Sequence, residues 1–317
     1  MEKNKNQKIT DFSSGSAGAG DLVKAMHSAG FQASHLAQGT ELTQEMLADK
    51  ECTVFFGFTA NLVASGVRGN IAELCRKKKV HAIVTTAGAI DHDIIKCFMP
   101  YEMGEFSADD AALHKKGINR IGNIFVRDRG FEILEKKVQG WLEEVYKKNK
   151  TTNPSRLAGF IGSKLGGEAG KAAEGSFLYW CAKNRIPVFC PGITDGAIGL
   201  QMYFFKERKP DFACDVTGDM KTLANLVLNA GRTGAIVLGG GIAKHHIIGA
   251  NILRSGLDYA VYVTTAQEFD GSLSGAQTRE AKSWGKLKEH GRSVTVNCDA
   301  TIAFPLMLGA LRGRGEL

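Results

Sequence analysis

The sequence predicts an α/β protein in which a doubly wound parallel sheet carries helices on both faces. Short β-rich runs such as 52–58 and 81–86 alternate with a helical pattern over 61–78, and the alternation returns after residue 187. Alternating strands and helices form parallel sheets with crossover helices. The hydrophobic content of 44% in 317 residues is enough for one large core.

Ordered structure is expected to begin near Asp21. Residues 1–20 contain Ser-Ser-Gly-Ser-Ala-Gly-Ala-Gly, which offers little to pack, so we expect a flexible N-terminal tail. Residues 21–317 are expected to form a single domain. Its first half should contain a strand over 52–58, one helix over 61–78 and a strand over 81–86.

The rest of the chain continues this order. An amphipathic pattern over 131–150 predicts a surface helix, which ends in a polar stretch before Pro154. After it we expect, as strands and helices in alternation, the segments 187–190, 197–205, 235–238, 244–254, 259–264 and 293–297, and a closing helix from Thr301.

Charge and cysteine usage exclude several classes. Lys and Arg exceed Asp and Glu by seven (40 against 33), but they are scattered in pairs such as Lys147-Lys148. We interpret them as a solvated basic surface and expect no nucleic acid; an acidic protein partner stays open. The seven cysteines form no CxxC pair and lie mostly in apolar runs, as in a reduced cytoplasmic protein without disulfides or zinc. The polar N-terminus predicts no membrane segment.

Small and polar residues follow several of the expected strands. They occur at 85–88, 194–196, 239–241 and 299–300. In open parallel sheets ligands bind beyond the carboxyl ends of strands, where helix N-termini attract phosphate. Together these junctions predict a nucleotide pocket, although each alone is equally compatible with a tight turn or a helix cap.

Two further segments carry chemistry. In the pair His245-His246 the side chains point about 100° apart on a helix and no ligand follows at i+4, so we expect no metal; one of them is a candidate base, or simply a hydrogen-bonded histidine. The loop 264–276 and the segment 280–286 combine glycines, acids, Trp284 and Lys286, as functional loops do. Lys286 is either a surface lysine or, if desolvated beside Trp284, an imine-forming nucleophile.

At these residues the sequence resembles the deoxyhypusine synthase family. The resemblance is carried by Ser283-Trp284-Gly285-Lys286, by the segment 239–246 and by the stretch 260–275, with further matching motifs between Phe31 and Pro305. The compact length and Leu273 resemble archaeal members.

The resemblance implies a cytoplasmic homotetramer of Rossmann-like subunits that uses NAD and spermidine to modify the translation initiation factor 5A precursor. The positions that match the family's NAD contacts are Asn61, Thr86, Ala87, Gly88, Asp195, Gly240, Thr265, Ala266, Ser274, Asp299 and Ala300. The positions that match the amine site are His245, Asp270, Gly271, Ser272, Glu280, Trp284 and Lys286. Lys286 matches the lysine that carries the aminobutyl group as an imine, and His245 the base.

The chain departs from eukaryotic members, which have acids at the positions of Leu200, Leu273 and His92 and an asparagine at Gly249. Fewer carboxylates would hold the far ammonium of spermidine less well, so agmatine or a putrescine-type amine is an alternative donor. The acceptor is a protein lysine or, as in homospermidine synthases, a free diamine. A regulatory subunit without activity and a plain dehydrogenase are the remaining alternatives.

Overall fold

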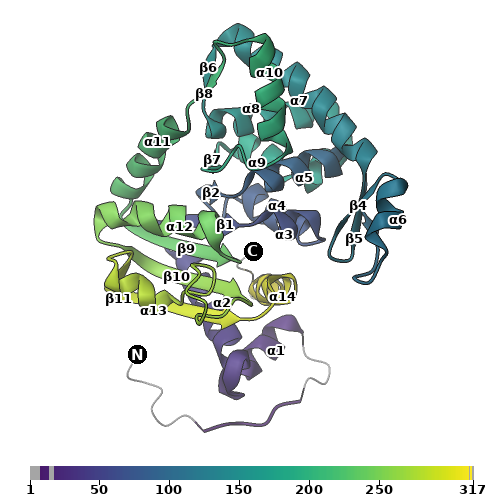
Figure 1. Ribbon diagram of the computed structural model, residues 1–317. Helices are drawn as coiled ribbons and strands as arrows, with labels where there is room; N and C mark the ends of the chain where they lie inside the picture. Colours follow the sequence, from purple (N-terminus) through teal and green to yellow (C-terminus); the bar gives the residue numbers. More distant parts are fainter. Residues whose placement is uncertain (1–7, 14–17, 314, 316–317) are drawn as a thin grey trace. The chain divides into compact units, whose positions relative to one another are not determined.

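The computed structural model (Figure 1) describes residues 8–13, 18–313 and 315. The chain forms two compact units, which we treat separately. The first unit takes the described residues of 1–57 and 226–317, and the second takes 58–225. Six parallel strands follow the order β11-β10-β9-β1-β2-β7, of which four belong to the first unit and two to the second. The predicted α/β class with a helix-flanked parallel sheet is confirmed.

The first unit combines four parallel strands with helices from both ends of the chain. Its elements are α1 (Ala19–Ala25), η1 (Met26–Ser28), α2 (Phe31–Ala48), β1 (Cys52–Phe58, whose last residue belongs to the second unit), β9 (Arg232–Leu238), α12 (Gly241–Ala250), η3 (Asn251–Arg254), β10 (Leu257–Thr264), α13 (Thr278–Ser283), β11 (Leu287–Asn297) and α14 (Ala300–Gly313).

Helices cover both faces of this part of the sheet. Successive side chains of a strand point to opposite faces. On the face of Val261, the close neighbours of Gly39 show that α2 packs against β10, β11 and α14. On the opposite face, Tyr262 lines a pocket together with residues of α12 and α13. On the face of Val261, the close packing of α2 needs a glycine at position 39, because a Cβ would lie only 3.1 Å from the Val296 side chain.

The second unit holds two strands of the parallel sheet, two small sheets and most of the remaining helices. Its elements are α3 (Ala60–Ala64), α4 (Arg68–Arg76), β2 (Ala82–Val84), α5 (Ala87–Phe98), β3 (Glu102–Met103), α6 (Asp110–Lys115), β4 (Ile118–Ile121), β5 (Ile124–Arg127), α7 (Asp128–Lys148), β6 (Thr151–Thr152), α8 (Pro154–Glu168), η2 (Gly170–Gly175), α9 (Phe177–Asn184), β7 (Val188–Phe189), α10 (Ala197–Arg208), β8 (Ala213–Cys214) and most of α11 (Val216–Leu228).

The prediction of one helix over 61–78 was wrong, because the structure has two short helices with a break between them. Ser65 has extended ψ (−178°) and ends α3. Its hydroxyl donates to the Leu62 carbonyl and accepts from the Val67 amide, so the side chain replaces helical hydrogen bonds. The antiparallel sheet β3-β5-β4 was not predicted, since its strands have two to four residues each.

The N-terminal and cysteine predictions have different outcomes. Of the predicted tail, residues 1–7 and 14–17 lie outside the described residues, and α1 begins at Ala19, two residues before the expected start of order. The single domain stays a prediction. All seven cysteines are free in the structure, and five of them are buried. No helix among the described residues is long and apolar enough to cross a membrane.

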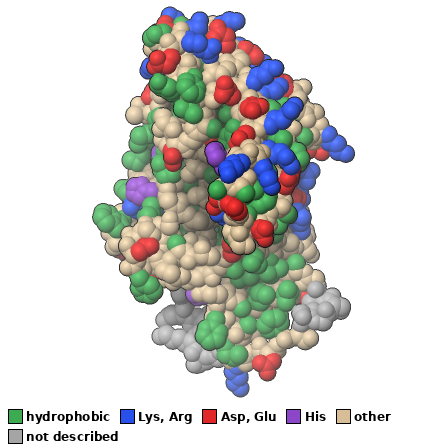
Figure 2. All heavy atoms as spheres, turned by 45° about the vertical axis from the view of Figure 1, so that its right-hand side comes forward, with side chains coloured by type: hydrophobic (Ala, Val, Ile, Leu, Met, Phe, Trp, Pro, Cys, Tyr) green, Lys and Arg blue, Asp and Glu red, His purple; other side chains and the backbone are tan. Residues whose placement is uncertain are grey.

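The surface charges are mixed in sign on the face that Figure 2 shows, where Lys and Arg side chains alternate with Asp and Glu. Many charged side chains of the described residues are paired, for example Lys137 with Glu168 at 2.6 Å and Lys164 with Glu144. This pattern agrees with a solvated surface better than with a continuous basic patch.

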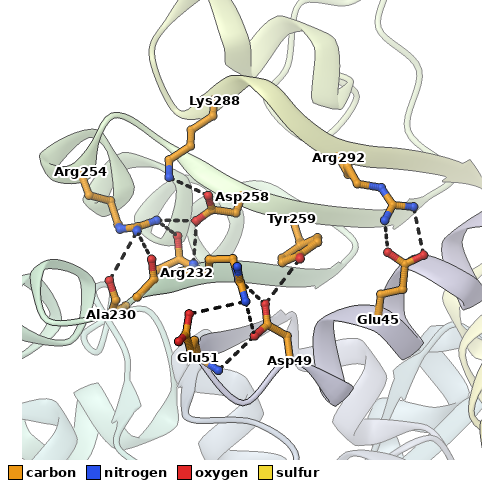
Figure 3. Close-up of polar contacts among 12 residues, drawn as sticks. Glu45, Asp49, Glu51, Ala230, Arg232, Arg254, Asp258, Tyr259, Lys288 and Arg292 are labelled. Carbon is orange, nitrogen blue, oxygen red and sulfur yellow. Dashed lines mark hydrogen bonds and ion pairs between the residues drawn. The ribbon is translucent and has the colours of Figure 1, made fainter. Parts of the chain in front are cut away.

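A charged network joins β9, β10 and β11 at their N-terminal ends in the first unit (Figure 3). Asp258 accepts hydrogen bonds from the Thr233 amide (2.9 Å), from Arg254 (2.6 Å) and from Lys288 (2.6 Å). Burial opposes the charge, but these donors hold the pKa of Asp258 below its usual value. One carboxylate therefore connects three neighbouring strands.

Replacing Asp258 by Asn should lower the free energy of unfolding by about 2–3 kcal/mol, because two cations and an amide lose a shared, half-buried partner. Urea unfolding at pH 7 measures the change. The control is Glu51→Gln, whose carboxylate pairs with Arg232 at 3.5 Å but is 72% exposed, and which should change stability by less than about 0.5 kcal/mol. Equal effects of the two substitutions would contradict the role of Asp258.

Candidate active site

Three strands of the first unit end at one edge of the sheet. In the register Val263 pairs with Leu238, and Thr264 pairs with Asn297. The amide of Gly239 donates to the Val263 carbonyl at 2.8 Å and that of Cys298 to the Thr264 carbonyl at 3.1 Å. The residues that follow β9, β10 and β11 therefore lie at the same edge, as predicted for a nucleotide pocket.

The predicted cofactor residues of this unit are distributed along that edge. They are Gly240, Thr265, Ala266, Ser274, Asp299 and Ala300. Gly240 lies so close to the loop that a Cβ would be 2.4 Å from Ser274 Cα. The Asp299 carboxylate accepts from the amide and hydroxyl of Thr301, both at 2.6 Å, so it caps α14. Capping leaves Asp299 exposed and able to accept further donors.

The remaining predicted cofactor residues, Asn61, Thr86, Ala87, Gly88 and Asp195, lie in the second unit. They gather where α3, α5 and α10 begin: a Cβ on Gly88 would be 3.0 Å from Ala60, and one on Gly196 would be 2.7 Å from Ala87. Oγ1 of Thr86, the N-cap of α5, is buried and has no hydrogen-bond partner in the structure. Buried hydroxyls normally have partners, so this one is available to a ligand.

The cap of helix α10 is Asp91, and not the neighbouring Asp195. Its buried carboxylate accepts from the amides of Ala197 (2.8 Å) and Ile198 (2.9 Å). Burial raises the pKa of Asp91 to about 6, although both amides act in the opposite direction. Asp195 is exposed beside this cap, and its side chain is free of that structural task.

The segment from α13 to β11 builds a small pocket in the first unit. Its lining residues are Lys244, Ile248, Tyr262, Leu273, Ala276, Gln277, Glu280, Ala281, Trp284 and Lys286. The Lys286 ammonium lies 5.0 Å from the centroid of the Trp284 ring. The Lys286 amide donates to the Ala281 carbonyl at 2.9 Å, and its carbonyl accepts from Leu257 at 3.1 Å. Both backbone bonds fix Lys286 between helix and sheet.

The turn between Trp284 and Lys286 needs a glycine. Gly285 has φ +64°, a conformation that L side chains rarely adopt. Its amide donates to the Lys282 carbonyl at 3.0 Å and closes the turn after α13. The Trp-Gly-Lys spacing thus places an aromatic face and an amine on the same side of the pocket.

The pocket does not collect all the predicted amine-site residues. It contains Glu280, Trp284 and Lys286, whereas His245 is exposed on α12 and is absent from the lining. The residues 270–272 form the exposed tip of the loop, where the amide of Ser272 donates to Asp270 at 2.7 Å. This hydrogen bond lowers the pKa of Asp270.

Two pocket residues, Lys244 and Tyr262, were not among the predicted site residues. Lys244 is 1% exposed, and burial lowers its pKa to about 8, partly offset by Glu280. The Tyr262 hydroxyl is buried without a partner. In the sequence Tyr262 belongs to an apolar strand and Lys244 lies beside two histidines, so only the alternation of β10 and the helical spacing from Gly240 could have indicated them.

Fold and site together define an α/β enzyme class with a lysine-bearing pocket beside a nucleotide-type sheet edge. The family model for deoxyhypusine synthase matches residues 21–311. The chain is 42% identical to a deoxyhypusine synthase of Senecio vernalis and 41% identical to homospermidine synthase 2 of the same plant, each over 316 residues that cover 90% of this chain and 84% of the relative.

A solved structure agrees with these relatives. The crystal structure of an Entamoeba histolytica protein assigned to the deoxyhypusine synthases superposes with a TM-score of 0.70 at 25% identity, covering 95% of this chain and 96% of that one. The protein belongs to the deoxyhypusine synthase family. The predicted family and its transferase class are confirmed.

Gly240→Ala should displace the loop 265–277, because its new Cβ would lie 2.4 Å from Ser274 Cα. We expect a loss of about 1–3 kcal/mol in unfolding free energy and faster tryptic cleavage at the exposed Arg279. Gly140→Ala in α7 is the control, since nothing lies within 4 Å of its Cβ position. Unchanged cleavage in Gly240→Ala would refute the close fit.

Asp91→Asn should change the pH dependence of stability. The folded pKa of about 6 lies above the ordinary 3.8, so the contribution of Asp91 is fully present below about pH 3.8 and is lost as pH rises through 6. Between pH 4 and 7 the wild type should therefore lose roughly 2–2.5 kcal/mol relative to Asp91→Asn. Parallel stability profiles in urea unfolding would contradict the raised pKa.

Proposed function

We propose that the protein transfers an aminobutyl group from spermidine to a lysine of the translation initiation factor 5A precursor, with NAD as cofactor and Lys286 as covalent carrier. The observation that carries the proposal is the position of the Lys286 amine over Trp284, in one pocket with Glu280. Family membership supports a cytoplasmic homotetramer as the working form.

One observation in particular supports the fit of the predicted cofactor residues to NAD. Thr86 Oγ1 is a buried hydroxyl without a partner at the start of α5, where a helix N-terminus favours phosphate. In the first unit Gly240 and Asp299 stand at strand ends in the manner of dinucleotide sites. When bound, NAD accepts a hydride from the carbon beside the amine nitrogen and later returns it.

The amine of Lys286 performs the transfer. It attacks the carbon of the C=N bond left by oxidation of the donor, the bond from that carbon to the old nitrogen breaks, and the remaining diamine leaves with the proton. The four-carbon unit is then held on Lys286 as an imine. The acceptor amine attacks the same carbon and releases Lys286, and reduction of the new C=N bond gives a stable secondary amine.

Three neighbours suit this chemistry. The Glu280 carboxylate pairs with a donor ammonium, the face of Trp284 covers the carbon chain or a cation, and the unpartnered Tyr262 hydroxyl offers a hydrogen bond inside the pocket. His245 would take up the N–H proton during oxidation from the exposed face of α12.

A free diamine is the second candidate acceptor. Homospermidine synthase 2 of Senecio vernalis is nearly as similar to this chain as the deoxyhypusine synthase of that plant, at 41% against 42% identity. Both acceptors require an amine that carries the butyl group, so the Lys286 pocket serves either reaction. The proposal favours the protein lysine, in keeping with the family model.

The donor is the other open choice. Glu280 is the only carboxylate among the pocket's described lining residues, and Leu273 lines the wall at a position where the resemblance implies an acid in eukaryotic members. A single carboxylate neutralises one ammonium. Agmatine and putrescine-type amines are therefore tested as donors together with spermidine.

The test incubates the protein with NAD and spermidine, agmatine or putrescine labelled in the butyl carbons, with and without the factor 5A precursor. Label in the precursor with spermidine is expected. Label there only with agmatine would overturn the donor, and label only in free homospermidine would overturn the acceptor.

Lys286→Ala should abolish both transfer and the label that borohydride traps on the enzyme, because no amine is left to carry the butyl group. Peptide mass spectrometry locates the trapped label. Lys282→Ala is the matched control: Lys282 lies on α13 and bonds the Glu289 carbonyl at 2.6 Å, so its loss should leave transfer within about twofold. Full transfer by Lys286→Ala would end the proposal.

A further inference from the structure

Lys244 is the most buried charged group in the wall of the pocket, and the reaction proposed above does not use it. It lies on α12 one helical turn after Gly240 and is 1% exposed. Removing an ammonium from water is costly unless its N–H groups find partners. The contacts of Lys244 therefore indicate what it is for.

All the contacts of the Lys244 amine lead to the loop 265–277 and to β10. Nζ donates to the carbonyl of Leu273 at 2.7 Å and to that of Ala276, and it lies 4.4 Å from the centroid of the Tyr262 ring. Two carbonyls and an aromatic face account for the three N–H bonds of a protonated lysine. The amine is thus fully engaged.

The start of the same helix holds the same loop segment. The Gly241 amide donates to Ser274 Oγ at 3.1 Å, and Gly240 packs directly against the Ser274 backbone. Because Gly241 and Lys244 are three residues apart, they face the same side of α12. The first turn of α12 therefore bonds residues 273–276 through the Lys244 side chain and the Gly241 amide.

The two lysines of the pocket differ in this respect. Lys286 makes no side-chain hydrogen bond with the described residues, and only the Trp284 ring lies over its amine. A nucleophile needs a free lone pair, whereas a tether needs its N–H bonds occupied. The amine of Lys286 therefore suits a nucleophile, and the hydrogen-bonded amine of Lys244 suits a structural tether.

We propose that Lys244 is a positioning residue that ties the loop 265–277 to α12 and so holds Ser274 and the loop tip 270–272 beside the pocket. This inference rests on the proposed function for the part that the loop has in amine binding. The tether acts through the carbonyls of Leu273 and Ala276, so it does not depend on the side chain at position 273.

The decisive comparison is Lys244→Met against Lys244→Gln. Met and Gln side chains have similar size and shape, but only Gln offers N–H donors. Hydrogen exchange at the amides of Gly275 and Ala276 should accelerate about tenfold or more in Lys244→Met and be partly restored in Lys244→Gln, because the lost bonds are those of a charged donor. A role in filling volume alone predicts equal exchange in both variants and would overturn the tether.

Kinetics provide the second measurement. The KM for the amine should rise in Lys244→Met more than kcat falls, with partial rescue in Lys244→Gln, and borohydride should trap label on Lys286 in both. A loss of kcat with unchanged KM, or label on Lys244 in the wild type, would refute a positioning role. If the wild type transfers no label, the proposed function fails, while the exchange experiment still decides the tether.

A measurement on the unaltered protein covers the case in which Lys244→Met does not fold. Reductive methylation with formaldehyde and cyanoborohydride, followed by peptide mass spectrometry, should modify Lys286 and leave Lys244 protected, since its amine is buried and bonded. Modification of both lysines at equal rates would overturn the tether.

Discussion

The site depends on the in-phase ending of three parallel strands. The pairs Val263 with Leu238 and Thr264 with Asn297 bring the ends of β9, β10 and β11 to one level. A shift of one residue would turn each strand's side chains to the opposite face. Gly240, Thr265 and Asp299 would then leave their common edge, and Tyr262 would leave the pocket.

The buried polar groups at the two ends of these strands differ in whether they have hydrogen-bond partners. At the N-terminal ends, Asp258 has two cationic partners and an amide, and it serves to join the strands (Figure 3). Near the C-terminal end of β10 the Tyr262 hydroxyl is buried without a partner among the described residues, and in the second unit the same holds for Thr86 Oγ1 at the start of α5. Buried polar groups normally have partners, so these two hydroxyls differ from the paired carboxylate of Asp258.

The division between Lys244 and Lys286 follows from the same principle. Both lysines line one pocket, yet the first is bonded to two loop carbonyls, whereas among the described residues only an aromatic ring lies over the amine of the second. In the proposed reaction the covalent carrier exchanges partners during each turnover, whereas the loop beside it stays in place.

The sequence alone determined the α/β class, the strands at 52–58 and 259–264 and the family, because alternation of apolar runs and ordered motifs are local properties of the chain. It could not show that Ser65 ends a helix, that Asp91 and not Asp195 caps α10, or that Lys244 is bonded to the loop. These features are hydrogen bonds whose partners are chosen by packing. Residues far apart in the chain, such as Lys244 and Ala276, meet only once the sheet has set their distance, so the tertiary structure alone decided which lysine amine is bonded to the loop.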